Sequence, residues 1–313
     1  MTEAMDLSGP ADPAVAPARD VGGRALTPAV VMLAVAVAVV SVLVGALMAG
    51  VSVAGHVFGA WKSPEALTPG LLGAAMLGVS PGLLVIGRAR VWEEVRTLVL
   101  PLAVVLVGLL AVSLRNADDL QVAKGGSVIL VLFSLGWIAV LGVLATAAIV
   151  CVGRQYTKPA LPARKRIAPL PGWSKPLLAV LGSSWLGIGA GLLARPHFWA
   201  DFVPWTVSRS DAQAVGVWAL ALGVGVLGAL AEDDLHRLRP ALLAVPGVAL
   251  AAAVVLAVHA SDVDWTSGPG LSLSVMIGGL LVTGATGTRL LSGGPAARRG
   301  DVETTVVEGS DRS

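Results

Sequence analysis

The chain has 313 residues, of which 55% are hydrophobic and only 13% are charged, and its formal net charge is +2. Its mean hydropathy is +0.81. Because an average soluble domain carries roughly 25% charged residues, this composition excludes an ordinary soluble fold and predicts a protein whose solvent is lipid. The nearly balanced charge gives no reason to expect nucleic acid as a partner.

Eight continuously apolar stretches follow one another along the chain. A bilayer core of about 30 Å is crossed by roughly 20 residues of helix. The stretches cover residues 27–50, 67–87, 97–114, 126–152, 176–194, 212–231, 240–259 and 271–291. They lack the alternation of a lumen-facing strand, which argues against a β-barrel, and helices satisfy their own backbone in lipid. The sequence therefore predicts an all-α membrane protein with about eight transmembrane helices.

Loops rich in lysine and arginine alternate along the chain with loops that contain few of them. If the N-terminus is cytoplasmic, 17 of the 22 lysines and arginines fall on the cytoplasmic side. The other five are Lys62, Arg115, Lys124, Arg195 and Arg209. The positive-inside rule then places both termini in the cytoplasm. We expect a multi-pass protein of the cell (cytoplasmic) membrane.

The spans divide into two groups of four. We expect a disordered cytoplasmic tail over 1–25, a membrane half over 26–152, a linker over 153–175, a second half over 176–292 and a disordered cytoplasmic tail over 293–313. Four prolines prevent a helix across the linker. Its basic run, Arg164, Lys165 and Arg166, is a candidate contact for anionic lipid headgroups at the cytoplasmic face; simple retention of topology is the alternative.

A shift of 143 residues brings features of the two halves into register. It pairs Gly73 with Gly216, Arg96 with Arg239 and Asp119 with Asp262. Since four crossings return the chain to its starting side, both halves have the same orientation. The sequence predicts two parallel four-helix repeats related by an axis along the membrane normal.

The second half carries a recognisable pattern. It consists of Phe198-Trp199, Asp211-Ala-Gln-Ala-Val-Gly216, the acidic and basic turn from Glu232 to Pro240, and Asp264-Trp265. Over about residues 197–290 this resembles a family of uncharacterised bacterial polytopic integral membrane proteins, which has no activity to carry over. The family pattern usually has an arginine where this chain has Gln213, so the resemblance gives that position no charged role.

The turn from Glu232 to Pro240 is a junction between two spans. Asp233, Asp234, Arg237 and Arg239 are its candidate functional residues. A solvated turn held by ion pairs is the first interpretation. A docking site for a cytoplasmic partner is the alternative.

Three histidines fall at the predicted outer face. His56, His197 and His259 share that face with several aspartates, and imidazole with carboxylate is a ligand set for zinc. Their spacing matches no short metal motif, so they are weak candidates, and isolated interfacial histidines are the alternative. Cys151 is the only cysteine, which excludes an internal disulfide. We predict no cofactor.

Aromatic and small residues indicate how the helices sit. Ten aromatic side chains lie near predicted span ends, where rings anchor to the membrane interface: Phe58, Trp61, Trp92, Tyr156, Trp173, Phe198, Trp199, Phe202, Trp205 and Trp265.

Gly187-x-x-x-Gly191 and Gly279-x-x-x-Thr283-x-x-x-Gly287 predict close helix contacts. Gly223-x-Gly225-x-x-Gly228 lies inside an apolar span, so it is not a dinucleotide fingerprint.

Three classes of function fit these features. A non-enzymatic membrane component, such as an accessory subunit with a membrane-protein partner, ranks first because no catalytic motif and no mid-span charge is found. A facilitator for an apolar or lipid-like solute is the alternative. A membrane enzyme that uses the outer histidines on a lipid-linked substrate ranks third. Membrane lipids are expected partners in every case.

Overall fold

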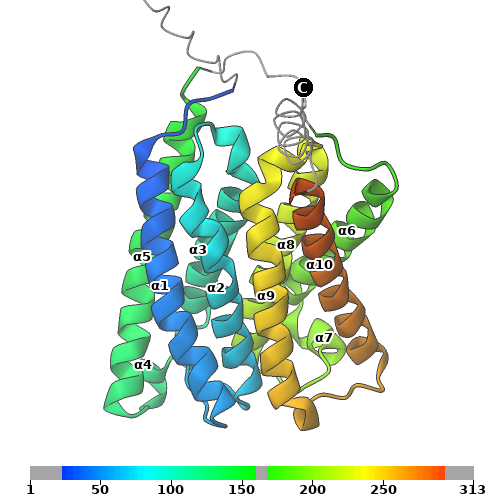
Figure 1. The fold of residues 1–313 in the computed structure, drawn as a ribbon. Helices are drawn as coiled ribbons and strands as arrows, with labels where there is room; N and C mark the ends of the chain where they lie inside the picture. Colours follow the sequence, from blue (N-terminus) through cyan, green and yellow to red (C-terminus); the bar gives the residue numbers. More distant parts are fainter. Residues whose placement is uncertain (1–22, 160–167, 293–313) are drawn as a thin grey trace, which may run out of the picture.

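A computed structural model describes residues 23–159 and 168–292 (Figure 1). In these two ranges the chain forms α-helices and short 3-10 turns, and no β-strand is present beyond two isolated bridges. Eight helices are long and apolar enough to cross a membrane. The predicted all-α class, with eight helices of membrane-spanning length and composition, is confirmed.

The eight spans lie within a few residues of their predicted positions. They are α1 (Pro28–Val53), α2 (Leu67–Val85), α3 (Arg96–Arg115), α5 (Val128–Tyr156), α6 (Ser174–Ala194), α8 (Arg209–Glu232), α9 (Arg239–Val258) and α10 (Gly268–Ser292). The largest difference is α5, which continues four residues into the predicted linker and ends before Pro159, the first proline there.

Short elements connect the spans and distinguish the two ends of the bundle. One end, which we call the α7 end, carries η3 (Ala117–Asp119), α4 (Gln121–Lys124), α7 (Pro196–Trp199), η4 (Ala200–Phe202) and η6 (Ala260–Asp262). The other, the η5 end, carries η1 (Ile86–Arg88), η2 (Trp92–Glu94) and η5 (Leu235–Leu238). In Figure 1 the α7 end lies at the bottom, with α4 and α7 on opposite sides of it.

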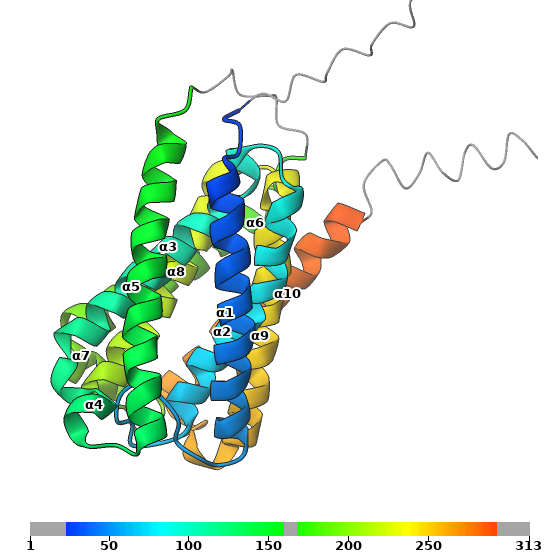
Figure 2. The ribbon, with the colours of Figure 1, turned by 90° about the vertical axis from the view of Figure 1, so that its left-hand side faces the viewer.

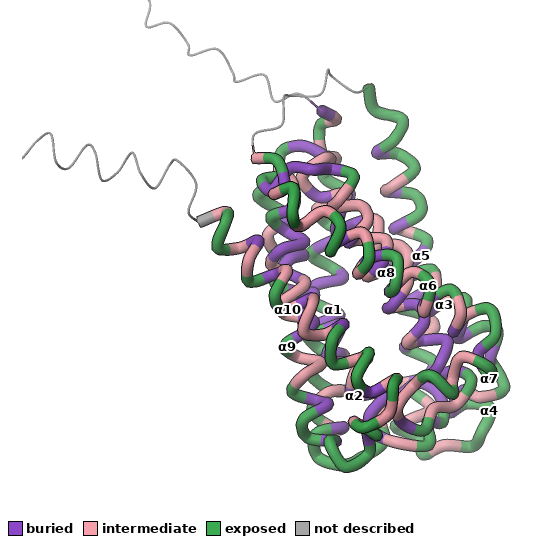
Figure 3. Tube along the Cα trace, turned by 90° about the vertical axis from the view of Figure 1, so that its right-hand side faces the viewer, coloured by how far each residue is buried: buried purple, intermediate pink, exposed green. Residues whose placement is uncertain are grey.

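The helices pack in an interleaved order. Helix α1 packs along α2, and α6 along α8; helix α2 then packs on α9, and α3 on α8. Both of the latter contacts join the first half of the chain to the second. Helices α5 and α10 lie outside, on α3 and α9 respectively, and α5 and α6 are largely exposed along their outer faces (Figure 3). The two halves therefore share one core.

Glycines let the backbones of paired helices approach closely. A Cβ on Gly73 would lie 2.8 Å from the carbonyl oxygen of Gly45, and one on Gly216 would lie 3.1 Å from that of Gly189. Small residues at such crossings are typical of membrane helix pairs. The predicted Gly187 pair is wrong, because Gly187 faces open space and Gly191 lies under the ring of Trp199. Glycines of α6 do bring it close to a neighbouring helix, as predicted, but they lie on a different face of α6 from Gly187.

Six of the ten predicted aromatic anchors form two groups. Trp61, Trp92 and Trp205 are at least 92% buried, so they belong to the core and not to the membrane interface. Phe198 and Phe202 are more than half exposed and stack with Trp199 across α7 and η4, with ring centroids 5.4–6.2 Å apart. Their position at a span end fits an interfacial anchor.

Candidate functional site

A fully buried carboxylate, Asp211, organises the α7 end. It begins α8 in a capping box, in which the Ser208 hydroxyl accepts from the Asp211 backbone N–H at 3.1 Å. Its Oδ1 accepts hydrogen bonds from Trp61 Nε1 at 2.8 Å and Ser63 Oγ at 2.7 Å. Both donors lie in the loop after α1. Asp211 thus joins the first half of the chain to the second through buried hydrogen bonds to a charged acceptor, which are among the stronger kinds.

Beside Asp211, a second polar contact joins three helices. Asn116, at the end of α3, donates through Nδ2 to Gln213 Oε1 at 2.7 Å. Gln213 in turn donates to the carbonyl oxygen of Leu193 in α6 at 3.2 Å. Gln213 is 2% exposed. A neutral amide suits this position because it can accept from one helix and donate to another.

His259 makes the third contact at this end. Its Nε2 lies 3.1 Å from Ser52 Oγ and 3.0 Å from the Ser52 carbonyl oxygen, and its Nδ1 lies 3.0 Å from Asp262 Oδ2. The order Ser, His, Asp has the pattern of a catalytic triad. However, the Ser52 hydroxyl donates its hydrogen to the carbonyl oxygen of Ala66 at 2.8 Å and not to the imidazole.

Ser52 is also only 1% exposed. Gly70 covers its hydroxyl: a Cβ added to this glycine would lie 2.1 Å from Ser52 Oγ. No substrate reaches a hydroxyl that is buried in this way and already donates to a backbone carbonyl. The arrangement therefore holds α9 to α1 and is not a nucleophilic site.

The other two predicted histidines lie elsewhere. His56 follows α1 and is exposed, and His197 lies in α7 and is also exposed. Within residues 23–159 and 168–292, no three His, Cys, Asp or Glu side chains gather closely enough to hold a metal ion. This part of the chain therefore contains no set of ligands for the zinc site that the sequence suggested.

Acidic residues after α8 join the halves at the η5 end. Glu232 is 4% exposed and forms ion pairs with Arg96 at the start of α3 and with Arg237 in η5, the latter at 3.5 Å. Arg96 belongs to the first half and Glu232 to the second. The pair is thus the counterpart, at this end, of the contacts that Asp211 makes at the other.

The next two acids fix the turn itself. Asp233 ends α8 in a left-handed conformation with φ 50°; its carboxylate accepts from Lys175 Nζ at 2.7 Å and from the Leu170 backbone N–H at 3.1 Å. Asp234 caps η5 by accepting from the His236 N–H at 3.1 Å and lies 3.7 Å from Arg237 Nε.

The structure thus brings together three of the four residues predicted for this turn. Asp233 and Asp234 are buried, contrary to the solvated turn we expected, and Arg239 is exposed. The other predicted contact residues, Arg164, Lys165 and Arg166, lie outside the described residues.

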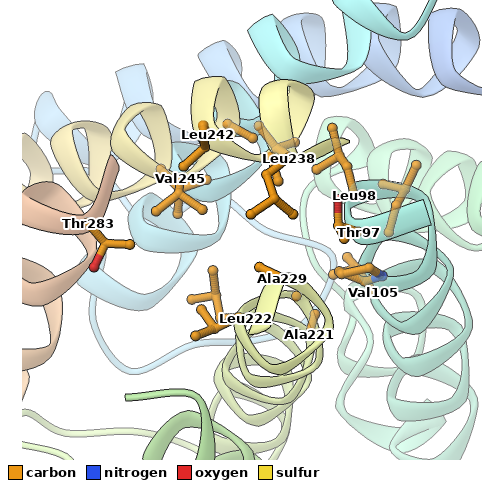
Figure 4. Close-up of a pocket in the computed structure, with 18 of the residues that line it drawn as sticks. Thr97, Leu98, Val105, Ala221, Leu222, Ala229, Leu238, Leu242, Val245 and Thr283 are labelled. Atoms are coloured by element: carbon orange, nitrogen blue, oxygen red, sulfur yellow. The ribbon is translucent and has the colours of Figure 1, made fainter. Parts of the chain in front are cut away.

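Between the two polar ends, the interface of the halves contains an apolar cavity of about 90 Å³, which we call the central cavity (Figure 4). Leu98, Leu222, Leu238, Leu242 and Val245 line it, together with residues of α2, α6 and α10. Figure 4 shows α3, α8 and α9 on three sides, with Thr283 of α10 on a fourth. None of the described residues that line it is charged.

A second cavity, of about 240 Å³, lies beside the first and is called the side cavity. Its walls come from α1, α2, α3 and α5, with Trp218 of α8. Four residues line both cavities: Val79, Leu102, Val105 and Trp218. The two spaces therefore adjoin along one wall.

Sequence reasoning missed the residues that join the halves. Ser208-x-x-Asp211 was a readable capping box, but nothing in the sequence paired Asp211 with Trp61, 150 positions earlier. No sequence motif identified Thr97 or Trp218, which both line the central cavity.

No protein-family model, curated protein or solved structure matches this chain.

Proposed function

We propose that this protein is a non-enzymatic integral membrane component whose two halves form one rigid body. The observation that carries the proposal is the presence of buried polar contacts between the halves at both ends of the bundle. At the α7 end, Trp61 and Ser63 meet Asp211; at the η5 end, Arg96 meets Glu232. A static body suits an accessory subunit or scaffold.

Energetics favour this class over one that works by opening and closing. Leaving a buried donor or acceptor unpaired costs about 1–3 kcal/mol. Separation of the halves would break the hydrogen bonds of Trp61 and Ser63 to Asp211 at the α7 end and the Arg96–Glu232 ion pair at the η5 end. The close approach of the helix backbones at glycines also opposes sliding of one half along the other, because larger residues would collide there. A Cβ added to Gly78, for example, would lie 2.4 Å from the Val248 backbone nitrogen.

An internal duplication is part of the proposal, and the helix pairs support it. Helices α3 and α9 have bounds 143 residues apart, as do η3 and η6. Gly82 approaches Pro240 and Ala244, while Gly225 approaches their counterparts at that shift, Thr97 and Pro101. Exchanged contacts of this kind are what a two-fold relation between repeats predicts.

We also propose that both termini are cytoplasmic, so that the η5 end faces the cytoplasm. The distribution of basic residues supports this orientation. Attachment of a membrane-impermeant thiol reagent to Asp264→Cys but not to Lys165→Cys in intact cells is the expected result. Labelling of both from the same side would contradict it.

The central cavity favours a second candidate, a facilitator for an apolar or lipid-like solute. Such a solute would pass between the halves, since α2, α3, α8 and α9 all line that space. This function requires the halves to part at one end and then the other, which makes the two candidates distinguishable by experiment.

Distance measurements between paired spin labels test the two candidates. In a Cys151→Ala background, Leu114→Cys with Val258→Cys reports on the α7 end, and Leu84→Cys with Leu290→Cys on the η5 end; all four labelled side chains are exposed. A rigid body gives one narrow distance distribution for each pair. Two distributions at either end would favour the facilitator and overturn the proposal.

Partner capture tests the remaining part. The protein is purified from its native membrane in lipid nanodiscs, and every bound protein is identified by mass spectrometry. A protein present at fixed stoichiometry is expected of an accessory subunit. Recovery of this chain alone, with a fixed distance at both ends, would leave a self-contained body and contradict the accessory role.

A further inference from the structure

We propose that the side and central cavities bind the acyl chain of a membrane phospholipid, which enters from the bilayer between α1 and α5. This goes beyond the proposed function, because a rigid membrane component needs no bound lipid. The two cavities lie within the membrane spans. Lipid hydrocarbon is the molecule found at that depth in a bilayer.

The lining of both cavities is mostly apolar, and none of the described residues in it is charged; its few polar side chains include Ser41, Thr97, Thr283 and Trp218. The side cavity is bounded by Val37, Val44, Met76, Leu106 and Leu141, among other apolar side chains. Its volume of about 240 Å³ exceeds the ~10–15 Å³ that one water requires, and an apolar cavity of about 150 Å³ stays dry and takes up benzene. An empty apolar space loses dispersion contacts on all its walls. A hydrocarbon chain restores those contacts without bringing a polar group into the core.

The side cavity opens on the lipid-facing side of the bundle. Gly136 and Val140 line it from α5, and both are exposed. On the opposite side of the opening, α1 contributes Val40 and Val44, which are half-buried. Figure 2 faces this side, where α1 and α5 stand apart and α3 and α8 cross behind them. An acyl chain lying beside these helices meets an apolar opening and has no polar barrier to cross.

From the opening the path continues inward. Val79, Leu102, Val105 and Trp218 form the wall between the two cavities and line both. Gly136 lies eight residues into α5, about 12 Å along its axis at 1.5 Å per residue, so the opening is in the outer part of the hydrocarbon region on the α7 side. The tail of a lipid whose headgroup lies at the α7 end of the bundle can therefore reach Trp218.

Two glycines of α5 provide a matched test. Neither Gly136 nor Gly142 has an atom within 4 Å of an added Cβ, so a side chain at either position begins in open space. Only Gly136 lines the side cavity. Gly136→Phe places a ring in the opening, and Gly142→Phe places the same ring on the same helix outside it.

The probe is a phosphatidylcholine with a diazirine at the methyl end of one acyl chain, added to nanodiscs of phosphatidylethanolamine and phosphatidylglycerol. After illumination, adducts are located by mass spectrometry and scaled to those on Leu132, which is 63% exposed on α5. We expect adducts on Leu102, Val105 and Trp218 in the unchanged protein. Gly136→Phe should lower them about tenfold, a loss of about 1.4 kcal/mol in affinity, while Gly142→Phe leaves them unchanged.

Two results would overturn the proposal. Adducts confined to exposed faces of the unchanged protein would mean that no acyl chain occupies the cavities. Equal labelling of the three cavity residues in both variants would mean that no chain enters between α1 and α5. Neither result bears on the rigid-body proposal, which the spin-label distances test separately.

Discussion

The two ends of the bundle close one interface with different chemistry. At the α7 end, neutral donors converge on Asp211, which is fully buried, and an amide pair, Asn116 with Gln213, lies beside it. At the η5 end, the Arg96–Glu232 ion pair joins the halves, and the side chain of Arg96 is 35% exposed. The neighbouring pair of Lys175 with Asp233 fixes the turn after α8, and its lysine side chain is 40% exposed. Burial makes hydrogen bonds costly to break, whereas exposed charges are screened by salt. The two ends should therefore respond differently to the same perturbation.

The largest effect is expected from Asp211→Ala. It leaves Trp61 Nε1 and Ser63 Oγ without their acceptor and removes the capping box of α8. Hydrogen bonds to charged groups contribute about 1.5–3 kcal/mol each, so the free energy of unfolding should fall by about 3 kcal/mol or more. Denaturant unfolding in a fixed detergent measures this. Asp201→Ala, at an exposed aspartate of the same end, is the control, and an equal loss there would contradict the assignment.

Glu232→Gln removes the charge that joins the halves at the η5 end. Arg96 and Arg237 then face a neutral amide. Because Arg96 is partly exposed, the loss should be smaller than at Asp211, about 2 kcal/mol. The same unfolding measurement applies, and spin-label distances at the η5 end should broaden while those at the α7 end stay narrow. Broadening at both ends would show that the ends are not independent.

His259→Leu tests the contact between α9 and α1. It removes the hydrogen bonds of the imidazole to Ser52 and Asp262, and a typical hydrogen bond contributes about 0.5–1.5 kcal/mol. We expect a loss of about 1 kcal/mol, measured as a lower thermal midpoint in detergent. His197→Leu, on exposed α7, should leave the midpoint unchanged. A destabilised His197→Leu would mean that the effect is not specific to this contact.

Lys175→Met should have the smallest effect. Its ion pair with Asp233 is 40% exposed on the lysine side, and such pairs contribute about 0.2–1 kcal/mol. The difference from the unchanged protein should vanish near 1 M salt, where the Debye length is about 3 Å. A difference that persists in high salt would show that packing, and not charge, is what the lysine contributes.

Helix positions and membrane class follow from the sequence because they depend on local properties. Each apolar run is bounded by charged or turn residues, and the observed spans lie within a few residues of the predicted ones. The capping box at Ser208 and Asp211 is also local, since its two residues lie three positions apart. Periodicity within an apolar run is weak, however, because lipid and neighbouring helices accept the same side chains.

Because this periodicity is weak, the sequence does not show which residues of an apolar segment face the core. Gly187 and Gly189 are indistinguishable in composition, yet Gly189 packs on α8 and Gly187 faces open space. Trp61 and Phe198 both stand at span ends, but Trp61 is in the core and Phe198 is exposed. For the glycines of α6 the rotation of the helix about its axis decides the outcome, and contacts with other helices set that rotation. For Trp61 the path of the loop after α1 decides it.

By itself the sequence determined the all-helical class, the presence of eight segments long and apolar enough to cross a membrane, and the ends of these segments to within a few residues, since all three depend on hydrophobicity over some 20 residues. Only the tertiary structure decided which polar residues meet. Trp61 with Asp211, Arg96 with Glu232, and Ser52 with His259 are separated by 136 to 207 positions. Such pairs form because a buried polar group must find a partner wherever the fold brings one within reach.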